Sequence, residues 1–192
     1  MPIGMDRVAE FIIFLSSSNE LREVRDRIEA ITERSINPLL FERSVRIRIR
    51  IDRWEHSVPK RVKTERANEL FVEQALNSHL TIVLLQDRLG PGTREELEAL
   101  LAEPVRGAAP SDPPGRPDLA LIRFTPSSSA KDADLAEIED FLKLNEEKMI
   151  YAGPDDAGDP ESDKSWFVIF RVLLGAVITA YQADSEEFHE SR

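Results

Sequence analysis

The chain of 192 residues contains no cysteine and only three histidines, His56, His79 and His189, which are widely separated. The absence of cysteine excludes disulfides, thiolate metal ligands and a cysteine nucleophile, and it agrees with a reducing compartment. The scattered histidines have no metal-ligand spacing, so we expect no metal site. The cytoplasm is the expected location.

Long hydrophobic segments are also missing. The longest, Trp166 to Tyr181, has 16 residues and includes Arg171, whereas a bilayer span needs about 20. The first apolar run, Phe11 to Leu15, is short and follows charged residues, which is unlike a secretory signal. We therefore expect no membrane association and interpret Trp166 to Tyr181 as a buried helix.

The chain has fewer basic than acidic residues, with 25 Lys and Arg against 36 Asp and Glu and a net charge of −11. An acidic domain repels the phosphates of DNA and RNA, so nucleic acid is not an expected partner. A small anionic ligand is still compatible with this charge, because clustered backbone N–H groups can bind it locally.

Short apolar runs alternate with segments of helical periodicity. Continuous apolar runs, typical of strands buried on both faces, span 10–15 and 80–85, and further short strands are expected at 119–124 and 149–152. Helical periodicity follows the first run, where Ser17 and Glu20 have capping-box spacing, and recurs in 64–77, 93–102, 132–147 and 165–182. The acidic segment from Pro154 to Asp163 is expected to be a loop.

One predicted strand differs from the others, because Val45 to Ile51 alternates strictly between apolar residues and arginines. A strand covered on both faces would bury the arginines, so this strand is expected at a sheet edge, where charge also prevents unwanted pairing. The second strand occupies an edge in the flavodoxin-like order 2-1-3-4-5.

The sequence therefore predicts an α/β fold, a flavodoxin-like doubly wound, five-stranded and mostly parallel sheet with helices on both faces. Residues 1–183 would form a single domain containing a Pro-rich loop at 103–117, and residues 184–192 would be a frayed tail. Ligands in such sheets bind beyond the carboxyl ends of the strands, where the strand order switches. Here that point lies between the first and third strands.

The first loop at the switch is the serine run Ser16, Ser17 and Ser18. These hydroxyls, together with the N–H groups of the following helix, could hold a phosphate or a ribose hydroxyl. Helix capping explains the same residues without any ligand. One serine can cap the helix while the others bind, so both interpretations stay open.

The second loop runs from Gln86 through Asp87 to Gly92 and Thr93, where a helix starts. Glu95, Glu96 and Glu98 lie in this helix, and acidic residues near a helix N-terminus are favourable for its dipole alone. A carboxylate directed into the cleft could instead stabilise or attack a sugar C1′. The sequence does not decide which glutamate faces the cleft.

Trp54 follows the edge strand and could stack on a base or a nicotinamide ring, although tryptophan is more often a packing residue. The chain contains neither the P-loop GxxxxGK[ST], nor the dinucleotide-binding GxGxxG, nor the GxSxG nucleophile elbow.

The segments FIIFLSSSNELREVRDRIEAI, IRIDRWEHSVP and LTIVLLQDRLGPGTREELEAL resemble the first three strands and following segments of bacterial TIR-like (Toll/interleukin-1 receptor-like) domains. The Gly-Thr-x-x-Glu of the last segment is similar to that of the nucleoside 2-deoxyribosyltransferases, a related superfamily. The resemblance implies that Glu96 acts on a ribosyl C1′, with Gly92 and Thr93 before it.

What the resemblance implies is cleavage of an N-glycosidic bond, with NAD or NADP as substrate rather than cofactor. It further implies a role in bacterial defence against phage or in signalling, with a homo-oligomer or a separate sensor protein providing regulation. Ser16, Ser17, Ser18, Asp87 and Thr93 would bind ribose or phosphate, and Trp54 the base.

The sequence departs from those relatives in that only Pro91 separates Gly90 from Gly92, a shortening that narrows or closes the pocket. Serines also replace the glycine-aromatic turn of the transferases, which favours hydrolysis over transfer. Two alternatives therefore accompany the enzyme hypothesis: a non-catalytic interaction module on the same fold, and a nucleotide receptor that binds without turnover.

Overall fold

The computed structural model describes residues 8–53, 64–104 and 117–190. Five strands form one sheet in the order β2-β1-β3-β4-β5, and every neighbouring pair is parallel. The strands are β1 (Ala9–Ser17), β2 (Ile47–Asp52), β3 (Leu80–Leu85), β4 (Asp118–Arg123) and β5 (Ile150–Ala152). This arrangement confirms the predicted flavodoxin-like doubly wound fold.

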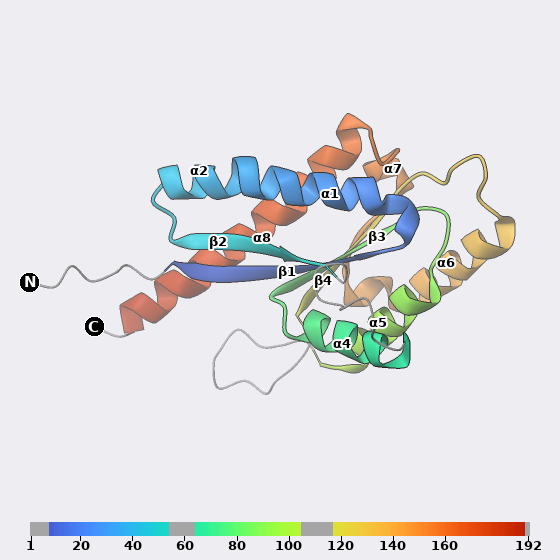
Figure 1. The fold of residues 1–192 in the computed structure, drawn as a ribbon, viewed down its shortest axis with the longest axis horizontal. Helices are drawn as coiled ribbons and strands as arrows, with labels where there is room; N and C mark the ends of the chain where they lie inside the picture. The colour runs from blue at the N-terminus through green and yellow to red at the C-terminus, as the bar shows by residue number, and fades with distance from the viewer. Residues whose placement is uncertain (1–7, 54–63, 105–116, 191–192) are drawn as a thin grey trace, which may run out of the picture.

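One face of the sheet is covered by α1, α2 and α8. These elements are α1 (Arg22–Ile31), a π-helical turn η2 (Thr32–Ile36), α2 (Asn37–Glu42) and α8 (Asp163–Glu190), and a short 3-10 turn η1 (Asn19–Leu21) precedes α1. Their apolar residues and those of all five strands form one buried cluster, in which Ile13, Ile28, Ile49, Ile82 and Ile122 are fully inaccessible. Figure 1 shows α1 and α2 lying along this face.

The opposite face is covered by α4 (Thr64–Leu76), α5 (Pro91–Ala102) and α6 (Asp132–Asn145). A second buried cluster, built around Phe14, Val83, Leu97 and Leu121, joins these helices to β1, β3 and β4. Two short elements flank β5, η3 (Glu146–Lys148) and α7 (Pro154–Ala157). Successive residues of a strand point to opposite faces of the sheet, so alternate residues of each buried strand belong to different clusters.

The arginine-bearing strand lies at the edge, as predicted. Ile47, Ile49 and Ile51 are buried, while Arg48 and Arg50 are exposed. Arg50 pairs with Glu10 of the neighbouring strand at 3.3 Å. The strand begins at Ile47 rather than at the predicted Val45, which packs against the cluster from the preceding turn.

Some predicted boundaries were wrong. The capping box at Ser17 does not form, because β1 continues through Ser17 and the helix begins after Ser18 without a side-chain cap. The segment from Pro154, predicted as a loop, contains the short helix α7. The last helix continues to Glu190, so residues 184–190, predicted as a frayed tail, are helical.

The interpretation of Trp166 to Tyr181 as a wholly buried helix also needs correction. One side of α8 packs on the sheet through Val168, Ile169, Leu173 and Val177, but Phe167 on the other side is 68% exposed. Among the described residues, no helix combines the length and the apolar character that crossing a bilayer requires.

Candidate functional site

The two loops expected at the switch point do lie side by side. β1 pairs with β3 in a register that sets Ser16 opposite Val83 and Ser17 opposite Leu84, so both strands end at the same edge of the sheet. The segment after β1 and the segment from Gln86 to Gly90 therefore emerge together, at the place where doubly wound proteins bind their ligands.

A direct contact between β1 and α5 is the central feature of this edge. The side chain of Ser16 points to the face that carries α5, and its hydroxyl donates a hydrogen bond to Oε2 of Glu96. α5 begins at Pro91, a residue well suited to a first helical position because its fixed φ is already helical. The inward side of α5 presents Thr93, Glu96, Leu97 and Leu100, which are all buried, so Thr93 stands one turn before Glu96 on the same side.

The rotation of α5 about its own axis determines which glutamate faces inward. Glu95 and Glu98 are exposed, whereas Glu96 is 7% exposed. The pKa of Glu96 is raised to about 7, mainly by burial and to a smaller extent by the neighbouring charge of Glu95, while the hydrogen bond from Ser16 lowers it. Near neutral pH the carboxyl is thus divided between its two protonation states, a property common in groups that transfer protons or stabilise charge.

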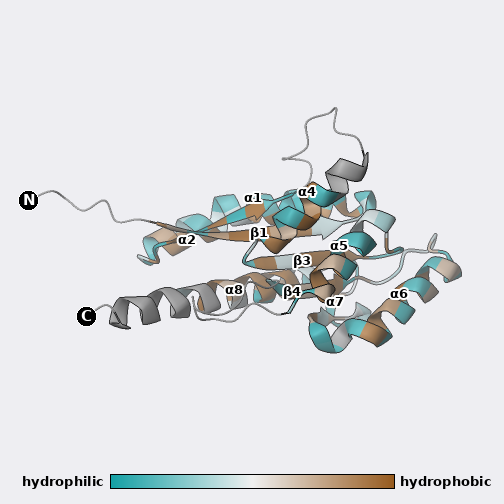
Figure 2. Ribbon diagram, turned by 90° about the horizontal axis from the view of Figure 1, so that it is seen from below, coloured by the Kyte–Doolittle hydropathy of each residue, from teal (hydrophilic) through white to brown (hydrophobic). Residues whose placement is uncertain are grey.

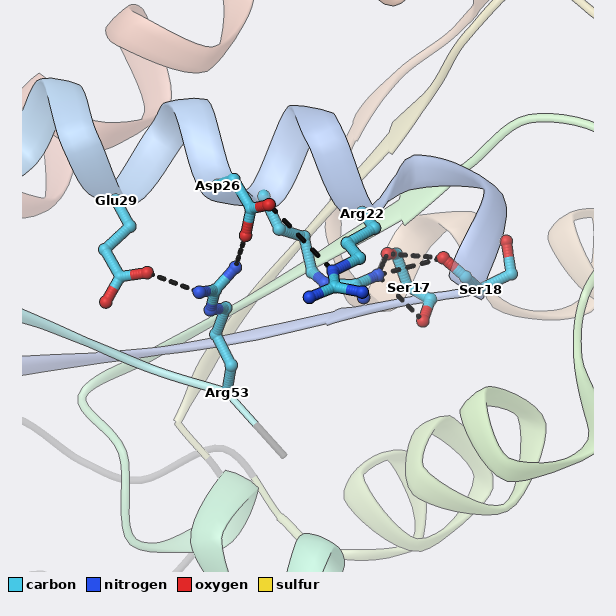
Figure 3. A network of polar contacts seen from close by, with 7 residues as sticks. Ser17, Ser18, Arg22, Asp26, Glu29 and Arg53 are labelled. Atoms are coloured by element: carbon cyan, nitrogen blue, oxygen red, sulfur yellow. Dashed lines mark hydrogen bonds and ion pairs between the residues drawn. The ribbon is translucent and has the colours of Figure 1, made fainter. Parts of the chain in front are cut away.

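The three serines point in different directions. Ser17 lies on the other face of the sheet and contacts Arg25 of α1, whose Nη1 donates to the Ser17 hydroxyl and, at 2.9 Å, to the Ser18 carbonyl (Figure 3). Arg25 has no exposed surface. The Ser18 hydroxyl is buried and has no hydrogen-bond partner among the described residues. Only Ser16 of the three reaches Glu96.

The side chain of Asp87 joins two loops. Its carboxylate accepts hydrogen bonds from the backbone N–H of Ser127 at 2.7 Å and from the Ser127 hydroxyl at 2.5 Å. The adjacent Arg88 pairs with Glu20 at 3.2 Å. The loop between β3 and α5 is thus tied to the β4–α6 loop on one side and to η1 on the other.

Trp54 lies outside the described residues, but Arg53, the residue before it, makes two ion pairs. Arg53 follows β2 and pairs with Asp26 at 2.5 Å and with Glu29 at 2.6 Å, both on α1 (Figure 3). Hydrogen bonding from Arg53 is the main reason why the pKa of Asp26 is lowered. These contacts fix the carboxyl end of β2 against α1.

Sequence reasoning missed Arg25 and Arg53. For Arg25 a signal was present: Leu21, Arg25, Ile28 and Thr32 recur at helical spacing and all are buried, so an arginine occupies a core position on the buried side of the helix. A charged residue at such a position is expected to bind buried polar groups. For Arg53 no local signal exists, because its partners come from a distant helix.

A cavity of about 520 Å³ opens near this edge on the face of α1 and is lined by Glu20, Leu21, Glu23, Val24, Gln86 and residues 159–162. Glu96 does not line it. Four of the lining residues are acidic, namely Glu20, Glu23, Asp159 and Glu161, so the cavity disfavours phosphate. Within the described ranges, no group of acidic or histidine side chains is arranged to hold a metal ion.

No protein family matches this sequence, and no curated protein does either. Among solved structures, the azoreductase from Bacillus anthracis str. Sterne is similar with a TM-score of 0.41 and 10% identity, covering 91% of this chain and 99% of that chain. A similarity at this level does not bear on the activity of this chain.

Proposed function

We propose that the chain is an N-glycosidase that cleaves the bond between nicotinamide and ribose in NAD or NADP, or the base–ribose bond of another nucleotide. The observation that carries the proposal is Glu96, a buried carboxyl with a pKa of about 7 at the switch point of the sheet. The resemblance of the first hundred residues to TIR-like domains agrees with this choice of bond.

Cleavage of this bond requires few catalytic groups from the protein. When the C1′–N bond breaks, its electron pair goes to the pyridinium nitrogen, and nicotinamide leaves as a neutral molecule without a proton. The oxygen of a water molecule then bonds to C1′ and loses a proton to Glu96 or to solvent, which gives ADP-ribose. A carboxylate beside C1′ stabilises the oxocarbenium-like transition state by its charge.

The contacts around Glu96 suggest the remaining roles. Ser16 orients the carboxylate and favours its charged form. Thr93 is one turn away, and the Ser18 hydroxyl has no partner within the described part of the chain; both offer polar groups to ribose or phosphate. Ser17 and Asp87 hold the surrounding loops through Arg25 and Ser127, so we assign them to positioning rather than to substrate contact.

Access to Glu96 requires movement. The side chain is 7% exposed, and the loop before α5 is held by Asp87 and by the Arg88–Glu20 pair. The Arg88–Glu20 pair is partly exposed and therefore contributes little to stability. Opening of this loop, promoted by a sensor protein or by self-association, would bring a ribosyl carbon to the carboxylate, so we expect slow turnover by the chain alone.

The test is nicotinamide release from NAD and NADP by concentrated protein, separated by chromatography, with Glu96→Gln and Glu98→Gln in parallel. Glu98 is the matched control, because it belongs to the same helix but is exposed. The proposal predicts release by the wild type and by Glu98→Gln, and a loss of about 100-fold or more in Glu96→Gln. Equal release by Glu96→Gln and the wild type would remove Glu96 from the reaction.

A second function, a non-catalytic interaction module, is favoured by the occlusion of Glu96. On this view the Ser16–Glu96 hydrogen bond simply joins α5 to β1. The two functions differ in ligand binding, since a ligand that binds the folded state raises its melting temperature. If no nucleotide raised the melting temperature and none were cleaved, the module would be the better description; a shift without cleavage would indicate a nucleotide receptor.

A further inference from the structure

α8 carries apolar side chains on two sides, although the sheet covers only one of them. Val168, Ile169, Leu173 and Val177 are buried against the strands. A helix that is hydrophobic on all sides is normally buried on all sides. Figure 2 shows hydrophobic turns along α8, and contiguous apolar surface of this kind usually marks an interaction site.

The uncovered side forms a continuous stripe. Its members are 45% to 68% exposed and follow one another at spacings of three or four residues: Phe167, Phe170, Leu174, Ile178 and Tyr181. At 100° per residue these positions fall within a sector of about 80°, which points away from the buried side. Arg171 lies at the border of the stripe, where interfaces tolerate charge.

The order of side chains along the stripe is symmetric about its centre. Phe167 and Tyr181 stand seven positions before and after Leu174, and Phe170 and Ile178 stand four positions before and after it. Two copies packed antiparallel about a two-fold axis at Leu174 would therefore set each aromatic residue against an apolar residue of the other copy. Such a self-complementary patch is what a two-fold interface requires.

The area is sufficient for association. Five large apolar side chains, each about half exposed, contribute on the order of 100 Å² each. The stripe would then bury about 500 Å² per copy and about 1,000 Å² in total, which is near the lower limit of specific interfaces. Three of the five are aromatic, the residue class that dominates interface energetics.

We propose that this α8 stripe is the interface of a homodimer, in which two copies pack α8 antiparallel around a two-fold axis at Leu174. Its occupant is a second copy of this chain, and Phe167 of each copy contacts Tyr181 of the partner subunit. The stripe lies on the face of α1 and α8, whereas Glu96 belongs to α5 on the opposite face, so the dimer leaves the candidate site uncovered.

The first test is the mass of the full chain by light scattering over a concentration series. The wild type should be dimeric at about 100 µM. Leu174→Arg sets two like charges together on the axis and should raise the dissociation constant by about 30-fold or more. Leu144→Arg, at an exposed leucine of α6, is the control and should leave the dimer intact. A wild type that stays monomeric, or a Leu174→Arg dimer of unchanged affinity, would refute the interface.

Cysteine cross-linking tests the register, since the native chain has no cysteine. Helices packed 8–10 Å apart bring facing Cα atoms on the axis to about 5 Å, within disulfide reach. Leu174→Cys should therefore form a covalent dimer under mild oxidation. Phe167→Cys alone should not, because its two copies lie on opposite sides of the axis, each seven residues of rise away from it, and are therefore about 20 Å apart.

A mixture of Phe167→Cys and Tyr181→Cys should again cross-link, and Leu144→Cys should not. Self-linking of Phe167→Cys as readily as Leu174→Cys would indicate parallel packing, in which every position faces its own copy, and would contradict the proposal. A monomeric wild type that sediments with phosphatidylcholine vesicles would assign the stripe to a lipid surface instead. These outcomes do not depend on nicotinamide release, so the dimer and the glycosidase can fail separately.

Discussion

The hydroxyl of Ser16 donates a hydrogen bond to Oε2 of Glu96, joining residues 80 positions apart in the chain. Ser16 lies at the end of a central strand, and Glu96 is in the second turn of the helix that follows the neighbouring strand. The contact buries a carboxyl at the switch point of the sheet and makes its ionisation depend on burial, on one hydroxyl and on the nearby charge of Glu95.

The first prediction concerns stability and pH. The pKa of Glu96 is raised from 4.5 to about 7 in the folded protein, so the folded state favours the protonated form. Its contribution to stability is complete below pH 4.5 and is lost as pH rises to about 7, by about 3 kcal/mol.

The measurement is urea unfolding of the wild type and Glu96→Gln at pH 4.5 and pH 8. The free energy of unfolding of Glu96→Gln should rise relative to the wild type by up to about 3 kcal/mol between these pH values. Glu98→Gln, at an exposed position, should show no such change. A difference independent of pH would mean that Glu96 keeps its ordinary pKa.

The second prediction concerns the pH dependence of nicotinamide release. Because the carboxylate is the active form, kcat/KM should increase with pH and reach half its maximum near pH 7, the pKa of Glu96 in the free protein. The cationic pyridinium ring favours the charged carboxylate, so kcat should reach half its maximum at a lower pH. Profiles that are flat from pH 5 to 8 would exclude Glu96 as the titrating group.

The third prediction concerns Ser16. Its hydrogen bond lowers the pKa of Glu96 against the effect of burial, so Ser16→Ala should shift the kcat/KM profile to higher pH. Loss of a buried hydrogen bond should also destabilise the fold by about 1–2 kcal/mol. Ser17→Ala is the matched control: it removes a contact to Arg25 on the other face and should leave the profile in place. Identical profiles for both variants would argue against the Ser16–Glu96 coupling.

The fourth prediction concerns the buried arginine. Arg25 is fully inaccessible and binds the Ser17 hydroxyl and the Ser18 carbonyl. Arg25→Ala removes the hydrogen bonds that these two groups accept from the guanidinium and creates a void, so it should lower the free energy of unfolding by about 2–4 kcal/mol. Arg22→Ala removes an exposed arginine from the same helix, 4.0 Å from Asp26, and should cost less than about 1 kcal/mol. Equal effects in denaturant titrations would show that the Arg25 contacts contribute little.

Much of the architecture was predictable from local pattern. Continuous apolar runs predicted the buried strands, and the alternation of isoleucine and arginine predicted an edge strand, because burial of charge is costly whatever the rest of the fold. The end of β1 was not predictable in this way. Ser17 fits a helix cap locally, but in the structure it pairs in register with Leu84 and binds Arg25, and these partners lie elsewhere in the chain.

The same division holds for the candidate site. Periodicity and composition are local properties, and they were enough to predict the order of strands and helices and to narrow the candidate carboxyl to three glutamates of one helix. Contacts between distant segments were needed to show that Glu96 faces Ser16, that Asp87 binds Ser127, and that one side of α8 is left uncovered. The rotation of a helix about its axis is set by what it packs against, and that information is distributed over the whole chain.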